Sequence, residues 1–537
     1  MKKLFLFLGV LFTFTSTIAQ KWEQTIGEPY ITETSNRGIE HYDKGYILTG
    51  TITAGYDDGH GWVVKTDING NVLWDKAFGV DPDQVILDNT QFDAQGNMYM
   101  FGTMKQDIEG DWPLLVKLNA CGEKEWCKYY GFTEEFKYGF FTDAMVLNNG
   151  DLLGLAYMVN KEGHQDRIFL YYVSPDGVLK WKKSYASCDN YPLFEDRLGR
   201  RIQQFDDIFI ISGYVNSPHP NIPNISSLRP MFIGIDTLFN EKWVLEFGLE
   251  DNMKGKAHTS IPINDSLFMG VGRYRYSDTT GMTKDAWAMF YNDKGQQTGY
   301  KRITRDKLGY EVSESTFYEV ERINDNMYIS TAGFYSTEYD EPTIGEIVFD
   351  TSGAVYNYVM RIGSVASTYL TKTFDNKYAI SSSLQYPNLS WDMLLYKINA
   401  YLEQDTLYPG NYTYDSLCPR TIESGIIDLA GCDVITSIGE IPTLEEYHKG
   451  LQSIPIKASP NPTSTGEVLL EMENTGLYAN MQLKVFDVYG KQIHSEKVYP
   501  HQGATRLNVS QWPSGMYIAT IFSNEQVKGK CKVLVRQ

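Results

Sequence analysis

The sequence contains no apolar segment long enough to cross a membrane as a helix. Its longest apolar run, Leu4–Phe14, falls well short of the roughly 20 residues that a bilayer requires. Two lysines precede this run, and the small-residue sequence Thr17-Ile18-Ala19 follows it. A basic start, a short apolar run and a small-residue cleavage site form the pattern of a secretory signal peptide. We therefore predict a signal peptide over residues 1–19 and an exported, soluble protein without a transmembrane segment after it.

Basic residues are also scarce. Lys and Arg together number 48 against 67 Asp and Glu, so the formal net charge is −19 and the sequence pI is about 4.9. A surface this acidic repels nucleic acid phosphates, and we therefore expect no nucleic acid partner. The same surface suits solubility outside the cell.

The common catalytic signatures are absent. There is no Gly-x-Ser-x-Gly elbow, no His-Glu-x-x-His motif and no phosphate-binding loop. The eight histidines are scattered, and only His219, in a long loop, is a candidate ligand contact. Four acidic pairs lie between repeats: Asp81/Asp83, Glu134/Glu135, Glu195/Asp196 and Glu250/Asp251. Such carboxylates could serve a glycosidase or bind calcium, but solvated surface charge is the stronger interpretation.

Metal-binding patterns are equally sparse. No Cys-x-x-Cys or neighbouring histidine completes a set of four zinc ligands. The sequence Asp67-x-Asn69-x-Asn71 resembles the start of a calcium loop, but its twelfth position is Phe78 rather than Glu. We predict no cofactor, and a structural calcium ion is the one metal left open.

Cysteine is rare, with six residues in the chain. Cys121 and Cys127 flank a turn, and two hairpin strands bring such residues within bridging distance in an oxidising compartment. We predict disulfides between Cys121 and Cys127 and between Cys418 and Cys432. Cys188 and Cys531 are expected to be unpaired.

What the chain does contain is a repeat of about fifty residues. A strand beginning Trp-x4-Gly occurs at Trp22, Trp74, Trp126 and Trp243, and looser copies begin at 181, 300, 358 and 405. Each repeat has four short apolar segments separated by Asp-, Asn- and Gly-rich turns that are typical of hairpins. A period of this length with four strands per repeat indicates a propeller, and eight copies of the motif bound seven repeats. We predict an all-β, seven-bladed β-propeller over residues 20–410, closed by the extra strand Trp22–Ile26 against the last blade.

The repeat resembles secreted and outer-surface bacterial propeller repeats of the form G-G-Y-I-x-x-G … W-x-V-K-x-D-x-x-G-N-x-x-W-x-K-x-x-G. Gly45–Gly79 matches nearly throughout, and repeats four to seven keep the skeleton. The resemblance implies the fold and no activity. A tryptophan that recurs once per repeat is interpreted as packing between sheets rather than as a ligand platform.

Loop lengths suggest a binding face. The connection between the second and third strands lengthens in repeats four to six, over 214–230, 273–285 and 334–343. Insertions on one face of a repeat array often mark its binding side. The candidate ligand contacts are Tyr214, His219, Arg229, Arg273, Tyr274, Tyr276, Tyr335 and Tyr339. Tolerated surface insertions are the alternative interpretation.

The period ends at residue 410. Residues 411–453 are predicted to be an ordered linker stapled by its own disulfide, and 454–537 a small β-sandwich. The last segment resembles the type A C-terminal sorting domain of the type IX secretion system of the Bacteroidota. The matching residues are Pro460, Asn461 and Pro462, Asp487 with Gly490 and Lys491, Trp512 with Gly515 and Tyr517, and a final strand beginning at Lys532. The family usually has Leu where Trp512 stands. The resemblance implies type IX secretion machinery as a partner and release or display at the outer surface.

Two hypotheses of function follow. The preferred one is a non-catalytic binding protein whose propeller face contacts a glycan or a protein. The alternative is a carbohydrate-active enzyme that uses paired carboxylates. Two acidic side chains converging about 5–10 Å apart at the central channel would favour the enzyme.

Overall fold

The structure is a computed structural model of the whole chain. It describes residues 21–28, 31–53, 59–79, 84–106, 110–130, 136–160, 167–186, 197–218, 226–248, 254–278, 281–303, 308, 312–336, 342–361, 368–386, 390–435, 454, 456–472, 481–499, 503–523 and 526–536. The predicted signal peptide, the four acidic pairs, His219, Tyr339 and Cys188 lie outside these residues.

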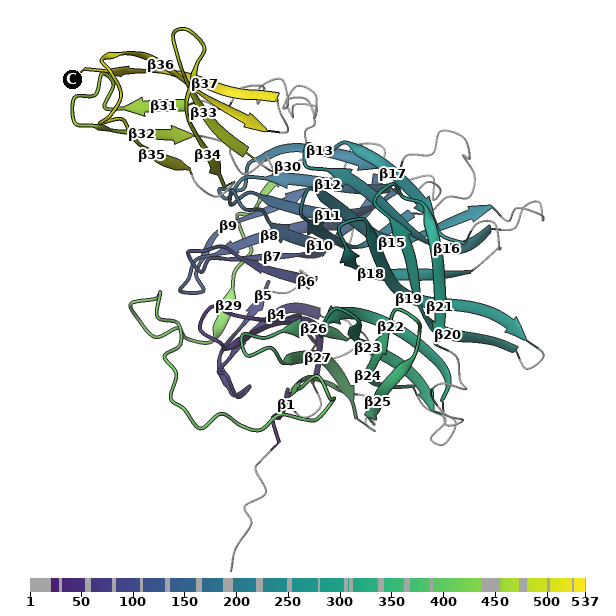
Figure 1. The fold of residues 1–537 in the computed structure, drawn as a ribbon. Coiled ribbons are helices and arrows are strands. Elements are labelled where there is room, and N and C mark those ends of the chain that lie inside the picture. Colours follow the sequence, from purple (N-terminus) through teal and green to yellow (C-terminus); the bar gives the residue numbers. More distant parts are fainter. Residues whose placement is uncertain are drawn as a thin grey trace, which may run out of the picture.

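The described residues between 21 and 398 form seven antiparallel sheets around one axis (Figure 1). Blade 1 contains β2 (Thr32–Glu40), β3 (Tyr46–Thr53), β4 (Gly59–Thr66) and β5 (Val72–Phe78). Blade 2 contains β6 (Gln84–Phe92), β7 (Met98–Gln106), β8 (Gly110–Leu118) and β9 (Lys124–Tyr130). Blade 3 contains β10 (Phe136–Val146), β11 (Leu152–Asn160), β12 (Arg167–Val173) and β13 (Leu179–Tyr185).

The second half of the ring continues the pattern. Blade 4 contains β14 (Arg197–Phe205), β15 (Ile208–Pro218), β16 (Ser226–Asp236) and β17 (Glu241–Glu246). Blade 5 contains β18 (Lys254–Asn264), β19 (Leu267–Asp278), β20 (Gly281–Asn292) and β21 (Gln297–Ile303). Blade 6 contains β22 (Val312–Arg322), β23 (Met327–Ser336), β24 (Pro342–Asp350) and β25 (Val355–Arg361). Blade 7 contains β26 (Tyr369–Lys372), β27 (Tyr378–Gln385), β28 (Trp391–Ile398) and β1 (Glu23–Ile26).

The ring is closed as predicted. The first strand of each blade contacts the first strands of both neighbours, so β2, β6, β10, β14, β18, β22 and β26 form a complete inner circle. The N-terminal strand β1 pairs antiparallel with β28 and supplies the outer strand of blade 7. Closure by a strand from the other end of the propeller leaves no open edge between the first and last blades. The predicted seven-bladed propeller is confirmed.

The recurring tryptophan and the recurring glycine turn are two halves of one contact between blades. The tryptophan near the start of an outer strand donates its indole Nε1 to a carbonyl in the turn of the next blade: Trp22 to Ile68 at 2.8 Å, Trp126 to Pro175 at 3.2 Å and Trp243 to Asp293 at 2.8 Å. The turn glycines Gly177 and Gly295 have φ of 83° and 72°, and a Cβ there would lie 3.2 and 2.5 Å from these indoles. Positive φ and close approach both require glycine. The tryptophans therefore hold the blades together.

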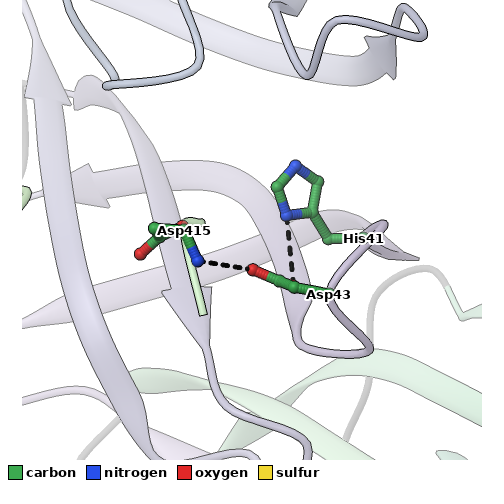
Figure 2. A group of neighbouring side chains, drawn as sticks. All are labelled: His41, Asp43 and Asp415. Carbon is green, nitrogen blue, oxygen red and sulfur yellow. Dashed lines mark hydrogen bonds and ion pairs between the residues drawn. The ribbon is translucent and has the colours of Figure 1, made fainter. Parts of the chain in front are cut away.

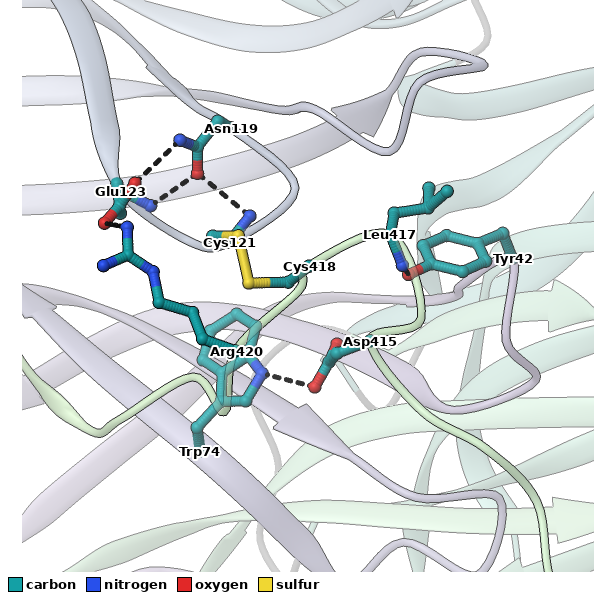
Figure 3. Close-up of a disulfide and its surroundings, with 9 residues drawn as sticks. All are labelled: Tyr42, Trp74, Asn119, Cys121, Glu123, Asp415, Leu417, Cys418 and Arg420. Atoms are coloured by element: carbon teal, nitrogen blue, oxygen red, sulfur yellow. Dashed lines mark hydrogen bonds and ion pairs between the residues drawn. A yellow bond between two sulfur atoms is a disulfide. The ribbon is translucent and has the colours of Figure 1, made fainter.

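The predicted disulfide pairing is wrong, although the same four cysteines are bridged. Cys121 bonds to Cys418 (Figure 3), and Cys127 bonds to Cys432. The hairpin register explains the error. Cys121 lies at the tip of the β8–β9 turn, whereas Cys127 stands opposite Val116 inside the ladder. The two cysteines of blade 2 therefore do not face each other. Among the described residues Cys531 is free.

The segment 411–435, here named the belt, consequently does not close on itself as predicted. It runs along the outer side of the first two blades, where β29 (Gly425–Ile427) pairs parallel with β5 and β30 (Asp433–Ile435) pairs parallel with β9 (Figure 1). Trp74 Nε1 donates to the Asp415 carboxylate at 3.0 Å (Figure 3). The belt thus covers two outer strand edges and is bonded to blade 2 at two points.

The C-terminal segment folds into two sheets. One contains β31 (Ile456–Ser459), β32 (Glu467–Met472) and β35 (Ala504–Asn508). The other contains β33 (Met481–Asp487), β34 (Gln492–Val498), β36 (Gly515–Ser523) and β37 (Gln526–Val535).

Several residues of the predicted sorting motif form specific hydrogen bonds or turns in this unit. The Asn461 side chain exchanges hydrogen bonds with the backbone of Lys532 and Leu534, at 2.7 and 2.8 Å, and so joins the Pro-Asn-Pro turn to the final strand. Tyr517 donates to the Pro513 carbonyl at 2.8 Å. Gly490 has a φ of 81° in a turn whose backbone donates to Asp487. Such turns favour glycine because of their positive φ.

Candidate ligand site in the central channel

Six of the seven inner strands carry a β-bulge at the same repeat position. The register shifts lie at 35/37, 87/89, 141/143, 199/201, 257/259 and 317/320. Each shift leaves an extra residue opposite no partner, and these residues are Asn36, Asp88, Thr142, Arg200, His258 and Tyr318 with Glu319. A bulge redirects the extra side chain out of the sheet. Here every one of them lines a single cavity at the centre of the ring.

The cavity has a volume of about 290 Å³. Its wall is completed by Phe140, Phe141, Leu198, Arg201, Thr368 and Tyr369. Several lining residues, among them Asn36, Phe140 and Tyr369, are only half-buried. The cavity is therefore near the lower end of the usual size range of small-molecule sites and is not sealed from solvent.

Asp143, next to one of the bulges, ties four blades together beside this cavity. Its carboxylate accepts hydrogen bonds from the Arg37 guanidinium at 2.7 Å, from the Asn89 amide at 2.5 Å and from the backbone N–H of Ile202 at 2.9 Å. The donors come from blades 1, 2 and 4, and Asp143 itself from blade 3. A buried carboxylate with this many partners holds the inner strands in a defined geometry.

The cavity contains two carboxyl groups in different environments. Glu319 accepts hydrogen bonds from Arg201, whose Nε lies 2.8 Å from its Oε1. Burial raises the pKa of Asp88 to about 7, and the more distant Arg201 charge offsets this only in part. Near neutral pH the site therefore holds one paired carboxylate and one carboxyl group that is partly protonated.

The side of the cavity formed by blades 4 and 5 is basic. It presents Arg200 and His258. Burial lowers the pKa of His258 well below its ordinary value, and the nearby charges of Arg200, Arg273 and Lys256 lower it further. Burial also lowers the pKa of Lys256 to about 8, with further contributions from Arg273 and Arg200. The Lys256 ammonium lies 3.8 Å from the centre of the Tyr214 ring. Arg200 Nε and His258 Nε2 are buried without a hydrogen-bond partner among the described residues.

The predicted contact residues are distributed unevenly around this site. Tyr214 lies under Lys256, while Arg273 and Tyr335 line a smaller cavity of about 140 Å³ that shares Tyr318 with the central one. Arg229 is fully buried and donates to the Gly248 carbonyl at 3.4 Å, which leaves it no surface for a ligand. Tyr274 packs against Trp287, with 5.3 Å between ring centres. The side chain of Tyr276, like His219 and Tyr339, lies outside the described residues.

Sequence reasoning missed the bulged residues, although a signal for them exists. In four of the six bulged blades a glycine of the second strand, Gly50, Gly102, Gly213 or Gly272, faces the residue just before the bulge, whereas alanine stands there in blades 3 and 6. A Cβ at these glycines would lie 1.7 to 2.0 Å from a carbonyl oxygen of the inner strand. In these four blades the close approach of the bulged strand requires glycine.

His41, Asp43 and Asp415 gather at a separate position where the belt meets blade 1 (Figure 2). Their potential ligand atoms lie within 4.8 Å of one another. The ammonium of Lys65 already occupies this space, 2.8 Å from His41 Nδ1 and 2.5 Å from Asp43 Oδ1. Burial alone would raise the pKa of Asp43, but the hydrogen bond to His41 and the charge of Lys65 lower it overall. We interpret the group as a buried ion pair rather than a metal centre.

Comparison with known proteins identifies the C-terminal unit. Residues 457–536 match the family described as the secretion system C-terminal sorting domain. This domain indicates a protein that is secreted or attached to the cell surface. In the part of the chain that the structure describes, no helix is long and apolar enough to span a membrane.

The propeller is distantly similar to several solved structures. No curated protein matches the chain. A protein of unknown function from Dyadobacter fermentans is 9% identical with a TM-score of 0.35, and the match covers 68% of this chain and 98% of that one. A neuraminidase-like protein of A/little yellow-shouldered bat/Guatemala is 9% identical with a TM-score of 0.35, and the match covers 70% of this chain and 99% of that one. An endo-arabinase from Bacteroides thetaiotaomicron is 10% identical with a TM-score of 0.29, and the match covers 47% of this chain and 92% of that one. We draw no functional conclusion from similarities of this size.

Proposed function

We propose that this chain is a non-catalytic binding protein, exported through the type IX secretion machinery, that holds part of a glycan or protein ligand in the central cavity. The observation that carries the proposal is the convergence of the bulged residues of six blades on one cavity. A bulge weakens the local hydrogen-bond ladder of the sheet. Six bulges at one repeat position are best explained by the side chains that they direct into the cavity. The sorting domain supports the extracellular location.

The test combines a glycan array with a variant that fills the cavity. Thr142→Trp places a large ring where a small bulged side chain stands, and Thr298→Trp makes the same change on the exposed outer strand β21. We expect the mature protein to bind a ligand saturably, Thr142→Trp to lose at least about tenfold in affinity and Thr298→Trp to retain it. Circular dichroism verifies that both variants fold. Equal binding by all three proteins would show that the ligand binds elsewhere.

A second candidate function, a glycosidase, is favoured by the two carboxyl groups of the cavity. Burial raises the pKa of Asp88 to about 7, as a general acid needs, and Glu319 forms an ion pair with Arg201. Product release from any bound glycan, abolished by Asp88→Asn, would establish this activity. Saturable binding without turnover supports the binding protein.

A further inference from the structure

We propose that the basic side of the central cavity binds an anionic oxygen group of the ligand, the carboxylate of an acidic sugar or a sulfate carried by a glycan. This inference rests on the proposed function and narrows its ligand class. The residues that would contact the anion are Arg200 and His258, which line the cavity on the inner strands of blades 4 and 5, and the neighbouring Lys256 and Arg273 of blade 5 would add positive charge.

The arrangement of charge is the first argument. The chain as a whole carries −19, yet four basic groups meet at this one side of the channel. Among the described residues none of the Arg200, Lys256 and Arg273 side chains forms an ion pair, whereas Arg201, the neighbour of Arg200, is paired with Glu319. Glu314 offsets part of the charge of Arg273, but like charges held this close together still repel each other. An anion at this place would relieve that repulsion.

The unpartnered atoms are the second argument. His258 is only 7% exposed and its Nε2 has no hydrogen-bond partner in the described structure, although the residue lines the cavity. Arg200 Nε is likewise buried without a hydrogen-bond partner, and Thr368 Oγ1, next to the inner strand of blade 7, is a third such atom. Buried polar atoms in native proteins are nearly always hydrogen-bonded. Three of them around one cavity point to a polar ligand that completes the bonding.

The size of the cavity favours a glycan over a protein partner. About 290 Å³ can take one sugar unit but not the flat surface of a folded protein. Phe140, Tyr318 and Tyr369 supply aromatic surface in the same wall, against which a sugar ring can pack.

The test uses D-galacturonate, D-galactose and sodium sulfate as probes, each at matched ionic strength with sodium chloride. Binding is measured by isothermal titration calorimetry and by the shift in Tm. We expect galacturonate, sulfate or both to bind the wild-type protein, and galactose to bind at least tenfold more weakly. Preference for galacturonate identifies a carboxylate site, and preference for sulfate identifies a sulfate site.

Two variants and a matched control assign the residues. Arg200→Gln and Lys256→Met should each weaken anion binding at least tenfold, whereas Lys301→Gln, which removes a charge from the exposed face of the same blade 5, should leave it unchanged. Arg200→Lys keeps the charge and should restore part of the affinity, which a merely misfolded variant would not do. The inference is overturned if neither anion binds better than galactose, or if Lys301→Gln weakens binding as much as Arg200→Gln.

The two proposals can fail separately. If neutral glycans bind on the array and Arg200→Gln retains them, the anion inference falls and the binding function stands. If the anions bind and Arg200→Gln abolishes this, but no array glycan or protein ligand competes with them, the anion site stands and the proposed function falls.

Discussion

The two disulfides should stabilise the protein in a strongly non-additive way. Each bridge spans a long segment, with sequence separations of 297 and 305 residues. In the chain-entropy description a loop of that length is worth about 6 kcal/mol. Once one bridge is in place, however, the other closes only the ring formed by 121–127 and 418–432, roughly 20 residues, which is worth about 3 kcal/mol.

We therefore expect Cys121→Ser/Cys418→Ser to lower the free energy of unfolding by about 3 kcal/mol and Cys127→Ser/Cys432→Ser by a similar amount. Removal of all four cysteines should cost about 9 kcal/mol, roughly half as much again as the sum of the two double variants. Without the disulfides, only two three-residue strands and exposed ion pairs would hold the belt to the propeller. This attachment is weak, because exposed ion pairs contribute at most about 1 kcal/mol each. Urea unfolding followed by tryptophan fluorescence measures these differences.

The control is Cys531→Ser, which removes the described free cysteine; because this side chain is only half-buried against the core, the free energy of unfolding should change by at most about 1 kcal/mol. Proteolysis without reduction should release a peptide containing Cys121 linked to one containing Cys418. A peptide linking Cys121 to Cys127 would refute the structural assignment, and simple additivity of the two double variants would refute the nested-loop reasoning.

Three further predictions concern the channel. Asp143→Asn should lower the free energy of unfolding by about 2 kcal/mol in denaturant titrations, because it removes a buried charged acceptor of three hydrogen bonds, one of them from the half-buried Arg37; a loss under 1 kcal/mol would contradict the bridging role. Asp88 has a folded-state pKa of about 7 against an ordinary 3.8, so its contribution to stability is present below pH 3.8 and is lost as the pH rises through 7. Asp88→Asn should therefore raise Tm at pH 8 more than at pH 4, and an equal change at both pH values would argue against the raised pKa. Because the pKa of Lys256 is about 8, binding of an acidic probe should weaken between pH 7 and pH 9, and this loss should be absent in Lys256→Met; calorimetry across that range decides it.

The repeat made the architecture predictable. Trp22, Trp126 and Trp243 stand at equivalent positions of their repeats because each closes the same contact on a glycine turn of the next blade. Such a contact depends on residues that stand at the same place in every repeat, so it leaves a periodic trace in the sequence. The sorting motif was predictable for a different reason: its residues match a known family pattern, in which Asn461 joins the turn to the last strand.

The candidate site leaves no such trace in its side chains. Asn36, Asp88, Thr142, Arg200 and His258 stand at one repeat position but share no chemistry, so no pattern of residue type marks them. Only the glycines opposite the bulges recur, and these mark the backbone approach rather than the ligand.

What the sequence by itself determined is therefore local and periodic: the strands, their turns, the number of blades and the sorting unit, all of which depend on neighbours along the chain or one repeat away. Tertiary structure alone decided that Cys121 meets Cys418 rather than Cys127, and that residues of six blades share one cavity. These outcomes depend on closing the ring, which brings together residues hundreds of positions apart, and no local pattern records which of them will meet.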